Sequence, residues 1–101
     1  MLHIVNKSPF ENTTLASCLR VACKGGGGAL LLIEDGVYAA TKNSIAGNVV
    51  RSAMGDIQVY ALWPDVEARG IQDRVLEGVK MVDYGGFVDL VVEHSNVQSW
   101  L

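Results

Sequence analysis

The stretch that most constrains the fold is residues 29–33, where five apolar side chains follow one another with no polar residue between them. A strand with one face in water alternates apolar and polar side chains, whereas an unbroken apolar run is typical of a parallel strand covered on both faces. Parallel strands also need crossover connections, which are usually helices lying on the faces of the sheet. The run therefore predicts a parallel sheet between two layers of helices.

The rest of the chain alternates strand-like and helix-like stretches, as a parallel sheet requires. Besides residues 29–33, we predict strands at residues 2–6, at residues 57–62 and in a short run that ends at Val82. We predict helices at residues 8–24, 44–54 and 63–69, and a last helix that contains Phe87, Val88, Leu90 and Val91. This order predicts one α/β domain over residues 1–101, with a small parallel sheet and helices on both faces, of the flavodoxin-like or Rossmann-like kind. We assign no strand to residues 97–101 and expect Trp100 to anchor to a core or a partner.

The composition favours a soluble subunit with buried contacts to other chains. Half of the residues are hydrophobic and only 19% are charged, against about 25% charged in an average globular domain. The net charge is −3 and the eight basic residues are scattered, so we expect no direct contact with nucleic acid. The sequence lacks a secretory signal and any apolar run near the roughly 20 residues of a membrane span. We therefore expect a cytoplasmic protein without membrane contact.

The first predicted helix, residues 8–24, carries both cysteines of the chain. Ser8, Pro9 and Glu11 match a capping box: Ser8 can accept from a free backbone amide, Glu11 can reach back, and Pro9 suits the first helical position. Downstream, apolar residues recur three and four positions apart, as in a helix with one face on a core. The pattern predicts a helix that begins at Ser8.

Cys18 and Cys23 are predicted to flank the apolar stripe of this helix on different sides. With 100° per residue, Cys18 lies about 60° to one side of Leu15 and Cys23 about 80° to the other. Their Cα atoms would be roughly 8 to 9 Å apart, beyond the limit of about 7 Å for a disulfide, so we expect free thiols. Thr14 and Val21 form a small shoulder beside Cys18, which makes Cys18 the better candidate for a reactive thiol. The alternative is that Cys18 is a small buried hydrophobe.

Two further stretches, the glycines at residues 25–28 and the acidic pair Glu34 and Asp35, could bind a ligand. Residues 25–28 are consecutive glycines, but a helix precedes them and a strand follows, the reverse of the order in a phosphate-binding loop. We interpret them as a helix C-cap and a flexible return. Glu34 and Asp35 follow a strand, at the edge where open α/β sheets bind ligands. They could act as acid and base or bind a cation, or Asp35 could cap the turn after Gly36.

The remaining polar candidates carry little specific signal. His3 alternates with apolar neighbours and is interpreted as a structural histidine, since no acid is paired with it in the sequence. Residues 83–86 form a strand-to-helix turn whose order suits an anion, although the fingerprint residues of a phosphate loop are absent. His94 lies near the end of the last predicted helix, where the helix dipole favours a cation. The sequence predicts no metal site and no cofactor.

Five segments form a collective pattern along the whole chain. They are, in order, LHIVNKSPF at residues 2–10, SCLR at 17–20, EDGVYAA at 34–40, DVEARG at 65–70 and VDYGGFV at 82–88. Each is weak alone, but their order, their spacing and the total length together resemble the DsrH/TusB family from end to end.

This resemblance implies a DsrEFH-like fold and membership of a sulfur-relay complex. By resemblance, the chain is the smallest of three homologous subunits in a heterohexamer that passes persulfide sulfur between proteins. One branch of the family serves dissimilatory sulfur oxidation, and the other serves the 2-thiolation of the wobble uridine of tRNA. The implied partners are DsrE/TusD-like and DsrF/TusC-like subunits, together with sulfur donor and acceptor proteins.

The resemblance also bears on the two cysteines. Cys18 falls on the cysteine that many DsrH-type members carry in their first helix and some TusB-type members lack, which favours the DsrH branch. The main sulfur acceptor of the family lies on a different subunit, so Cys18 is either an auxiliary persulfide carrier or a packed residue. Cys23 matches no family motif. Arg20 points about 160° away from Cys18 on a straight helix, so we do not expect it to activate the thiol.

Three functions are therefore weighed. The first is a sulfur-relay subunit in which Cys18 is the candidate persulfide carrier, acting within a sulfurtransferase complex rather than as a stand-alone enzyme. The second is a purely structural subunit of the same complex. The third is a small nucleotide- or flavin-binding domain, suggested by the fold and by residues 83–86.

Overall fold

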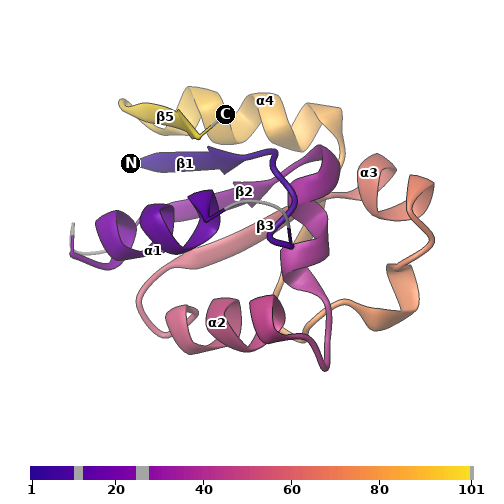
Figure 1. Ribbon diagram of the computed structural model, residues 1–101. Coiled ribbons are helices and arrows are strands. Elements are labelled where there is room, and N and C mark those ends of the chain that lie inside the picture. The colour runs from indigo at the N-terminus through magenta and orange to yellow at the C-terminus, as the bar shows by residue number, and fades with distance from the viewer. Residues whose placement is uncertain (11–12, 25–27, 101) are drawn as a thin grey trace.

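The sheet has five strands, all parallel, in the order β4-β3-β2-β1-β5 (Figure 1). The computed structural model describes residues 1–10, 13–24 and 28–100. The strands are β1 (Leu2–Val5), β2 (Ala29–Leu32), β3 (Gln58–Leu62), β4 (Lys80–Val82) and β5 (Val97–Trp100). The first four are the strands that the sequence predicts, and the parallel sheet is confirmed.

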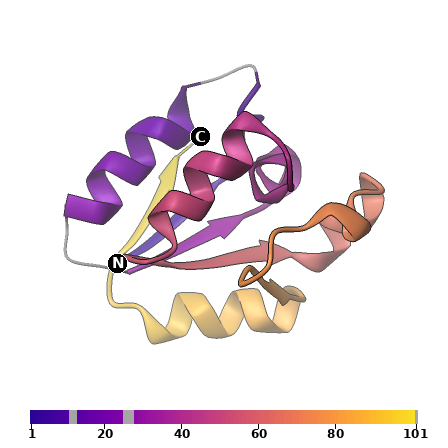
Figure 2. The ribbon, with the colours of Figure 1, turned by 90° about the horizontal axis from the view of Figure 1, so that it is seen from below.

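Helices cover both faces of this sheet, as predicted (Figure 2). The helices are α1 (Thr14–Lys24), α2 (Ile45–Ala53), α3 (Trp63–Ala68) and α4 (Tyr84–Glu93), with two 3₁₀ helices, η1 (Glu34–Ala40) and η2 (Gln72–Arg74). Figure 2 shows α1 and α2 together on one face of the sheet and α4 alone on the other. The small α/β fold is therefore a sheet with one crowded and one sparsely covered face. No helix in the described ranges is long and apolar enough to cross a bilayer.

The connections explain the strand order. Strands β1 to β4 are added one after another in a single direction across the sheet. After β4 the chain crosses the opposite face through α4 and returns to the far side of β1 as β5. The order of strands thus reverses beside β1.

The fifth strand is absent from the sequence-based prediction. Among the described strands it pairs with β1 alone, at the edge of the sheet, and its residues Gln98 and Ser99 are exposed. Its sequence therefore lacks the apolar run that marks a strand covered on both faces. Trp100 packs against the main core, which confirms that it anchors the end of the chain.

Strand side chains alternate between two cores, one on each face. In β2, Leu30 and Leu32 face the core under α1 and α2, while Ala29 and Leu31 face the core under α4 together with Leu90. All four β2 residues are buried. The unbroken apolar run therefore has the cause that the sequence indicated, which is a helix layer on each face.

The first helix begins later than predicted. It starts at Thr14 rather than Ser8, and the predicted start at Ser8 is wrong. The Ser8 hydroxyl accepts from the Phe10 amide at 3.2 Å, two residues on, so it closes a local turn rather than capping a helix. Glu11, the other half of the predicted capping box, lies outside the described residues, as do Gly25, Gly26 and Gly27 of the predicted C-cap.

The second helix follows the prediction closely. Ser44 is its N-cap, and the Ser44 hydroxyl accepts from the Gly47 amide at 2.9 Å. The same hydroxyl donates to the Thr41 carbonyl at 3.0 Å. Met54 is the C-cap, so the predicted range 44–54 is the helix together with its two caps.

η1 folds over the carboxyl end of β1. The Ile33 amide donates to the Val5 carbonyl at 3.0 Å, and the Gly36 amide donates to the Ile33 carbonyl at 2.8 Å. Gly36 packs so closely on Val5 that a Cβ there would overlap the Val5 carbonyl oxygen. The segment predicted as a turn at this edge is therefore an ordered 3₁₀ helix held against the end of the sheet.

Candidate functional site

Cys18 lies on the buried face of α1. Its side chain has 0% exposure, and it is buried together with Leu15, Leu19 and Ala22. The sequence placed Cys18 on an accessible shoulder beside the apolar stripe, and this placement is wrong. The buried residues run from Cys18, about 60° to one side of Leu15, to Leu19, about 40° to the other. This arc of about 100° is the width that a core-facing helix buries.

The environment of Cys18 suppresses its reactivity. Burial, and secondarily the neighbouring Cys23, raise the pKa of the Cys18 thiol to about 12, because a thiolate loses its hydration in the core. The nucleophilic form of cysteine is the thiolate, so at neutral pH this thiol is protonated and unreactive. Arg20 is exposed and donates to Ser17 Oγ at 3.2 Å, in keeping with the prediction that it does not activate the thiol.

Cys23 is the more accessible of the two cysteines. It is half-buried at the edge of the main core, and both cysteines are free thiols, as predicted. Cys18 therefore lacks the exposed surroundings of a reactive cysteine.

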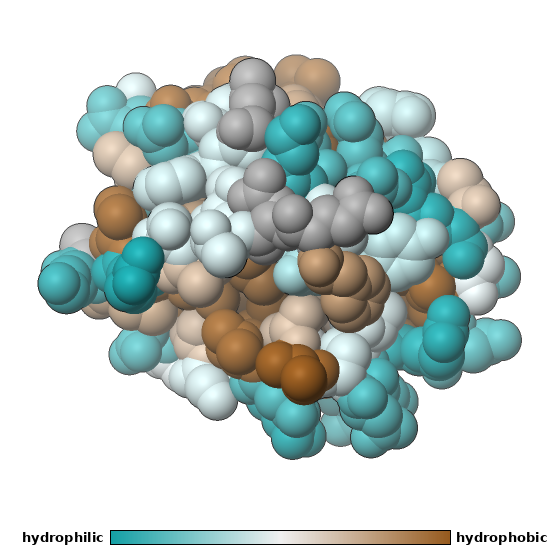
Figure 3. Space-filling model, viewed as in Figure 1, coloured by the Kyte–Doolittle hydropathy of each residue, from teal (hydrophilic) through white to brown (hydrophobic). Residues whose placement is uncertain are grey.

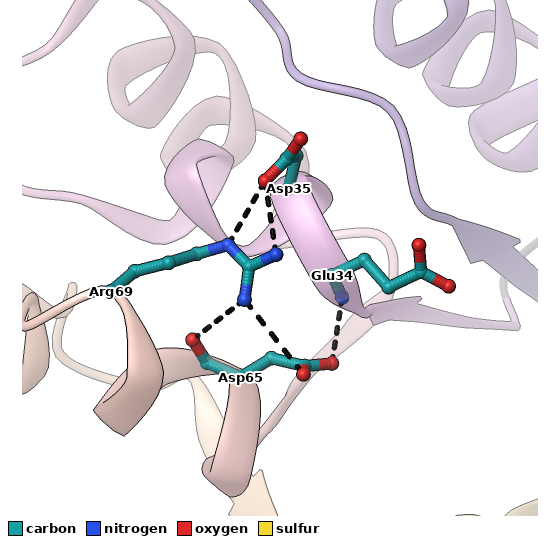
Figure 4. A network of polar contacts seen from close by, with 4 residues as sticks. All are labelled: Glu34, Asp35, Asp65 and Arg69. Atoms are coloured by element: carbon teal, nitrogen blue, oxygen red, sulfur yellow. Dashed lines mark hydrogen bonds and ion pairs between the residues drawn. The ribbon is translucent and has the colours of Figure 1, made fainter.

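Arg69 connects η1 to α3 at the carboxyl edge of the sheet (Figure 4). Its Nε donates to Asp35 Oδ1 at 3.0 Å, and its Nη2 lies 3.0 Å from the same oxygen. Its Nη1 donates to the Asp65 carbonyl oxygen at 3.2 Å and lies 3.8 Å from Asp65 Oδ1. Asp65 Oδ2 in turn accepts from the Glu34 backbone amide at 2.7 Å. Two segments more than thirty residues apart are thereby joined by one guanidinium and one carboxylate.

This network accounts for the acidic pair that follows β2. Asp35 pairs with Arg69, and η1 has no side-chain cap, so the prediction that Asp35 caps the turn is wrong. The Glu34 carboxylate points away from Asp35 (Figure 4), which does not suit a paired acid and base. Within residues 1–10, 13–24 and 28–100, no three acidic, histidine or cysteine side chains gather in a way that could hold a metal ion.

Sequence reasoning missed Asp65 and Arg69. Their spacing of four residues is the signal that was available, because it places opposite charges side by side on a helix. Their bonds to Glu34 and Asp35 depend on the order of β2 and β3 in the sheet, which the local pattern does not contain.

The turn before α4 provides its own negative charge. Asp83 is the N-cap of α4, and its Oδ1 accepts from the Gly86 amide at 2.8 Å. The carboxylate thus occupies the position that an anionic ligand would take at this helix N-terminus. The arrangement disfavours the predicted binding of a nucleotide phosphate at residues 83–86.

Both histidines make hydrogen bonds that hold secondary structure elements in place. His3 is 2% exposed, and its Nδ1 accepts from Trp100 Nε1 at 3.1 Å. Burial, followed by the nearby N-terminal amine, lowers the pKa of His3, so the ring is neutral and joins β1 to β5. His94 is the C-cap of α4 and lies, through Nδ1, 2.8 Å from the Leu90 carbonyl oxygen. Both side chains have structural partners.

The surface carries an apolar hollow, which we call the α1–α2 groove. It has a volume of about 540 Å³ and a mainly apolar lining that includes Pro9, Phe10, Ala16, Ile45, Ala46 and Val49, with Thr13 and Ser44 as its polar residues. Ile45 is 86% exposed and Phe10 is 66% exposed. Figure 3 shows apolar side chains gathered on this side of the molecule. Contiguous exposed apolar surface of this kind marks a site of interaction.

The opposite face carries a second apolar surface, the α4 ridge. It consists of Tyr84, Val88 and Val92, which are exposed and recur every four residues along one side of α4. The molecule therefore presents apolar surface on both layers of the sandwich, which fits the contacts with other chains expected from the low content of charge.

The sequence and the fold were compared with known proteins. The family model described as "DsrH like protein" matches residues 7–97. "Protein TusB" of Pectobacterium parmentieri is 36% identical over 101 residues, which cover 99% of this chain and 100% of the relative. "Protein TusB" of Shigella flexneri is 39% identical over 100 residues, with the same coverage of both chains.

Solved structures support the fold. The E. coli ychN protein superposes with a TM-score of 0.80 and 17% identity, covering 97% of each chain. Protein MTH1491 of Methanobacterium thermoautotrophicum, described as of unknown function, gives a TM-score of 0.73 and 21% identity, covering 97% of this chain and 95% of its own. The match of the family model to most of the chain and the full-length TusB relatives show that this chain belongs to the DsrH/TusB family.

Proposed function

We propose that the chain is a subunit of a sulfur-relay complex that works in the 2-thiolation of tRNA wobble uridine. The observation that carries this proposal is the match to TusB proteins along the whole of both chains at 36–39% identity. This match over the full length takes precedence over the single residue Cys18, whose presence favours the DsrH branch by resemblance. The proposed complex is the heterohexamer of three homologous subunits that the family resemblance implies, and sulfur passes through it as persulfide.

Within this complex we assign the chain a scaffolding role. Cys18 as a persulfide carrier stays a prediction, and its burial and its pKa of about 12 count against it. A carrier thiol must meet the sulfur of a donor protein and attack it as a thiolate, whereas Cys18 is protonated and enclosed. Its packing among the buried residues of α1 supports the structural alternative. The reacting cysteine is then supplied by another subunit.

The surfaces of the chain support this role. Phe10, Ile45 and Val49 on one face and the α4 ridge on the other leave apolar side chains in water. Burying such side chains contributes about 1.5–3 kcal/mol for each residue fully covered. Contacts with neighbouring subunits through these two surfaces would cover the apolar side chains that are exposed in the single chain.

Loss of 2-thiouridine from tRNA tests the proposal. Deleting the gene is expected to abolish the 2-thio group at the wobble position, as measured by mass spectrometry of digested tRNA, and the wild-type gene is expected to restore it. A Cys18→Ala variant that folds is expected to restore it as well, because the thiol is not needed for transfer. Cys23→Ala is the matched control, since it removes the other thiol from the same helix.

Two results would contradict these assignments. If tRNA thiolation is unchanged in the deletion strain while oxidation of reduced sulfur fails, the chain serves the other branch of the family. If the Cys18→Ala subunit assembles with its partners but thiolation is lost, and the wild-type subunit gains the mass of one sulfur atom at Cys18, the thiol is a carrier.

A further inference from the structure

The charges of α1, α2 and α4 are separated between the two faces of the sheet. On the crowded face, α1 and α2 contain Arg20, Lys24 and Arg51 and no acidic residue. On the sparse face, α4 contains Asp89 and Glu93 and no basic residue. All five of these side chains are exposed. The chain is acidic overall, with a net charge of −3, so the positive character of the α1–α2 layer is a local departure from its average.

The cations are in line with the α1–α2 groove. Ala16 lines the groove, and Arg20 and Lys24 follow it at intervals of four residues along α1, which places all three on one side of the helix. Arg20 donates to Ser17, within its own helix. Among the described residues, ion pairs with carboxylates form at Arg69 alone. An apolar hollow is thus continued by a row of cations without a carboxylate partner in the described structure.

We propose that the α1–α2 groove is the docking site for an amphipathic helix of a partner subunit, whose apolar row is flanked by a row of carboxylates. The proposal rests on the assignment of the chain to a multi-subunit complex. The apolar row of the partner helix enters the groove against Phe10, Ile45 and Val49. The carboxylate row lies along Arg20 and Lys24.

Complementary charge and shape argue for this occupant. The groove is apolar and its volume of about 540 Å³ accommodates several side chains, so an apolar helix face fits it better than a polar loop. Potentials of opposite sign across an interface steer association and select the correct partner. A basic helix would place like charges against Arg20 and Lys24, at an energetic cost.

The chain itself contains a helix of this design. In α4, Tyr84, Val88 and Val92 form an apolar row, and Asp89 and Glu93 form an acidic row one position further around the helix. The sheet separates α4 from the α1–α2 groove of the same molecule. A helix with the α4 pattern can therefore reach the groove only from another chain, and homologous partner subunits of the same fold are the chains in which such a helix is expected.

The test uses the full chain, purified alone, and its two homologous subunits, co-expressed with each other. Ile45→Asp places a charge in the groove at a residue that is 86% exposed, so the isolated chain is expected to fold normally. We expect at least a tenfold loss of affinity for the partners, measured by biolayer interferometry. Gln72→Asp is the control, because it adds the same charge at an exposed residue of η2 away from the groove.

Charge reversal tests the chemistry of the occupant. Arg20→Glu with Lys24→Glu is expected to slow association about tenfold at low salt and to remove most of its salt dependence, with Arg74→Glu as the control at another exposed site. Unchanged rates would overturn the acidic occupant, and an undiminished affinity of the Ile45→Asp variant would overturn the docking site. If the isolated chain forms a homodimer that Ile45→Asp dissociates, the occupant is a second copy and the proposal is wrong. A wild-type chain that binds neither subunit would overturn both the docking site and the proposed function, whereas wild-type binding that the variants leave unchanged overturns the docking site alone.

Discussion

Cys18 shows how far a helical pattern can predict the setting of one residue. The sequence correctly indicated the helix that carries it, the stripe of Leu15, Leu19 and Ala22, and the free thiols. The angular position of Cys18 was also correct, but the width of the buried arc was not known. That width depends on how closely the sheet and α2 approach α1, which is a property of the packed fold. A cysteine can be a reactive site where the helix surface is open to solvent, and it is a core residue where that surface is covered.

Alkylation of the folded protein measures whether the Cys18 thiol is enclosed in the core or accessible to a reagent. Iodoacetamide at neutral pH is expected to modify Cys23 first, while Cys18 stays unmodified until the protein is unfolded. A pKa of about 12 instead of 9.0 lowers the thiolate fraction of Cys18 by about a thousandfold, and burial slows the reaction further. Peptide mass spectrometry identifies the modified residue. Equal rates for the two thiols in the folded state would show that Cys18 is accessible.

The raised pKa of Cys18 also predicts how the stability of the fold changes with pH. The pKa of Cys18 is higher in the folded state than in the unfolded state. The protonated thiol therefore makes its full contribution to the free energy of unfolding below about pH 9, and this contribution is lost as the pH rises toward 12. The Cys18→Ala variant is expected to lose less stability than the wild type over this alkaline range.

At the scale of the elements, local signals predicted most of the helices and four of the strands. The bounds of the second helix were predicted closely because the signals at its ends are local, as in the N-cap bond of Ser44, which spans only three residues. The start of α1 was wrong because Ser8 has a competing local partner in the Phe10 amide. β5 was missed because an exposed edge strand has no apolar run. The contact between Arg69 and Asp35 could not be predicted from local patterns, because the two residues meet only after β2 and β3 pair.

Gly36 tests the close contact between η1 and the end of β1. Gly36→Ala is expected to lower the free energy of unfolding by about 1–3 kcal/mol, because the new methyl group overlaps the Val5 carbonyl oxygen and forces the backbone apart. Gly55→Ala is the matched control, since no atom lies within 4 Å of a Cβ built there. Urea denaturation followed by circular dichroism gives both values. A loss of stability that is equal in the two variants would show that η1 does not pack on β1 as described.

At the scale of the whole molecule, the two faces of the sheet differ in cover, charge and shape. The α1–α2 layer is thick, basic and grooved, while the α4 layer is a single acidic helix with an apolar ridge. The low content of charged residues predicted contacts with other chains, but it did not indicate where they lie. The positions of the groove and the ridge follow from the reversal of the strand order, which sends α4 alone across the second face.

Native mass spectrometry of the chain co-expressed with its two homologous subunits tests the central proposal most directly. The measurement is made on the purified complex at physiological salt, with the Gln72→Asp and Ile45→Asp chains in parallel. The proposal predicts a six-chain assembly that contains this subunit, and it predicts that Ile45→Asp alone removes the subunit from that assembly. A wild-type chain that stays monomeric beside its co-expressed neighbours would contradict it.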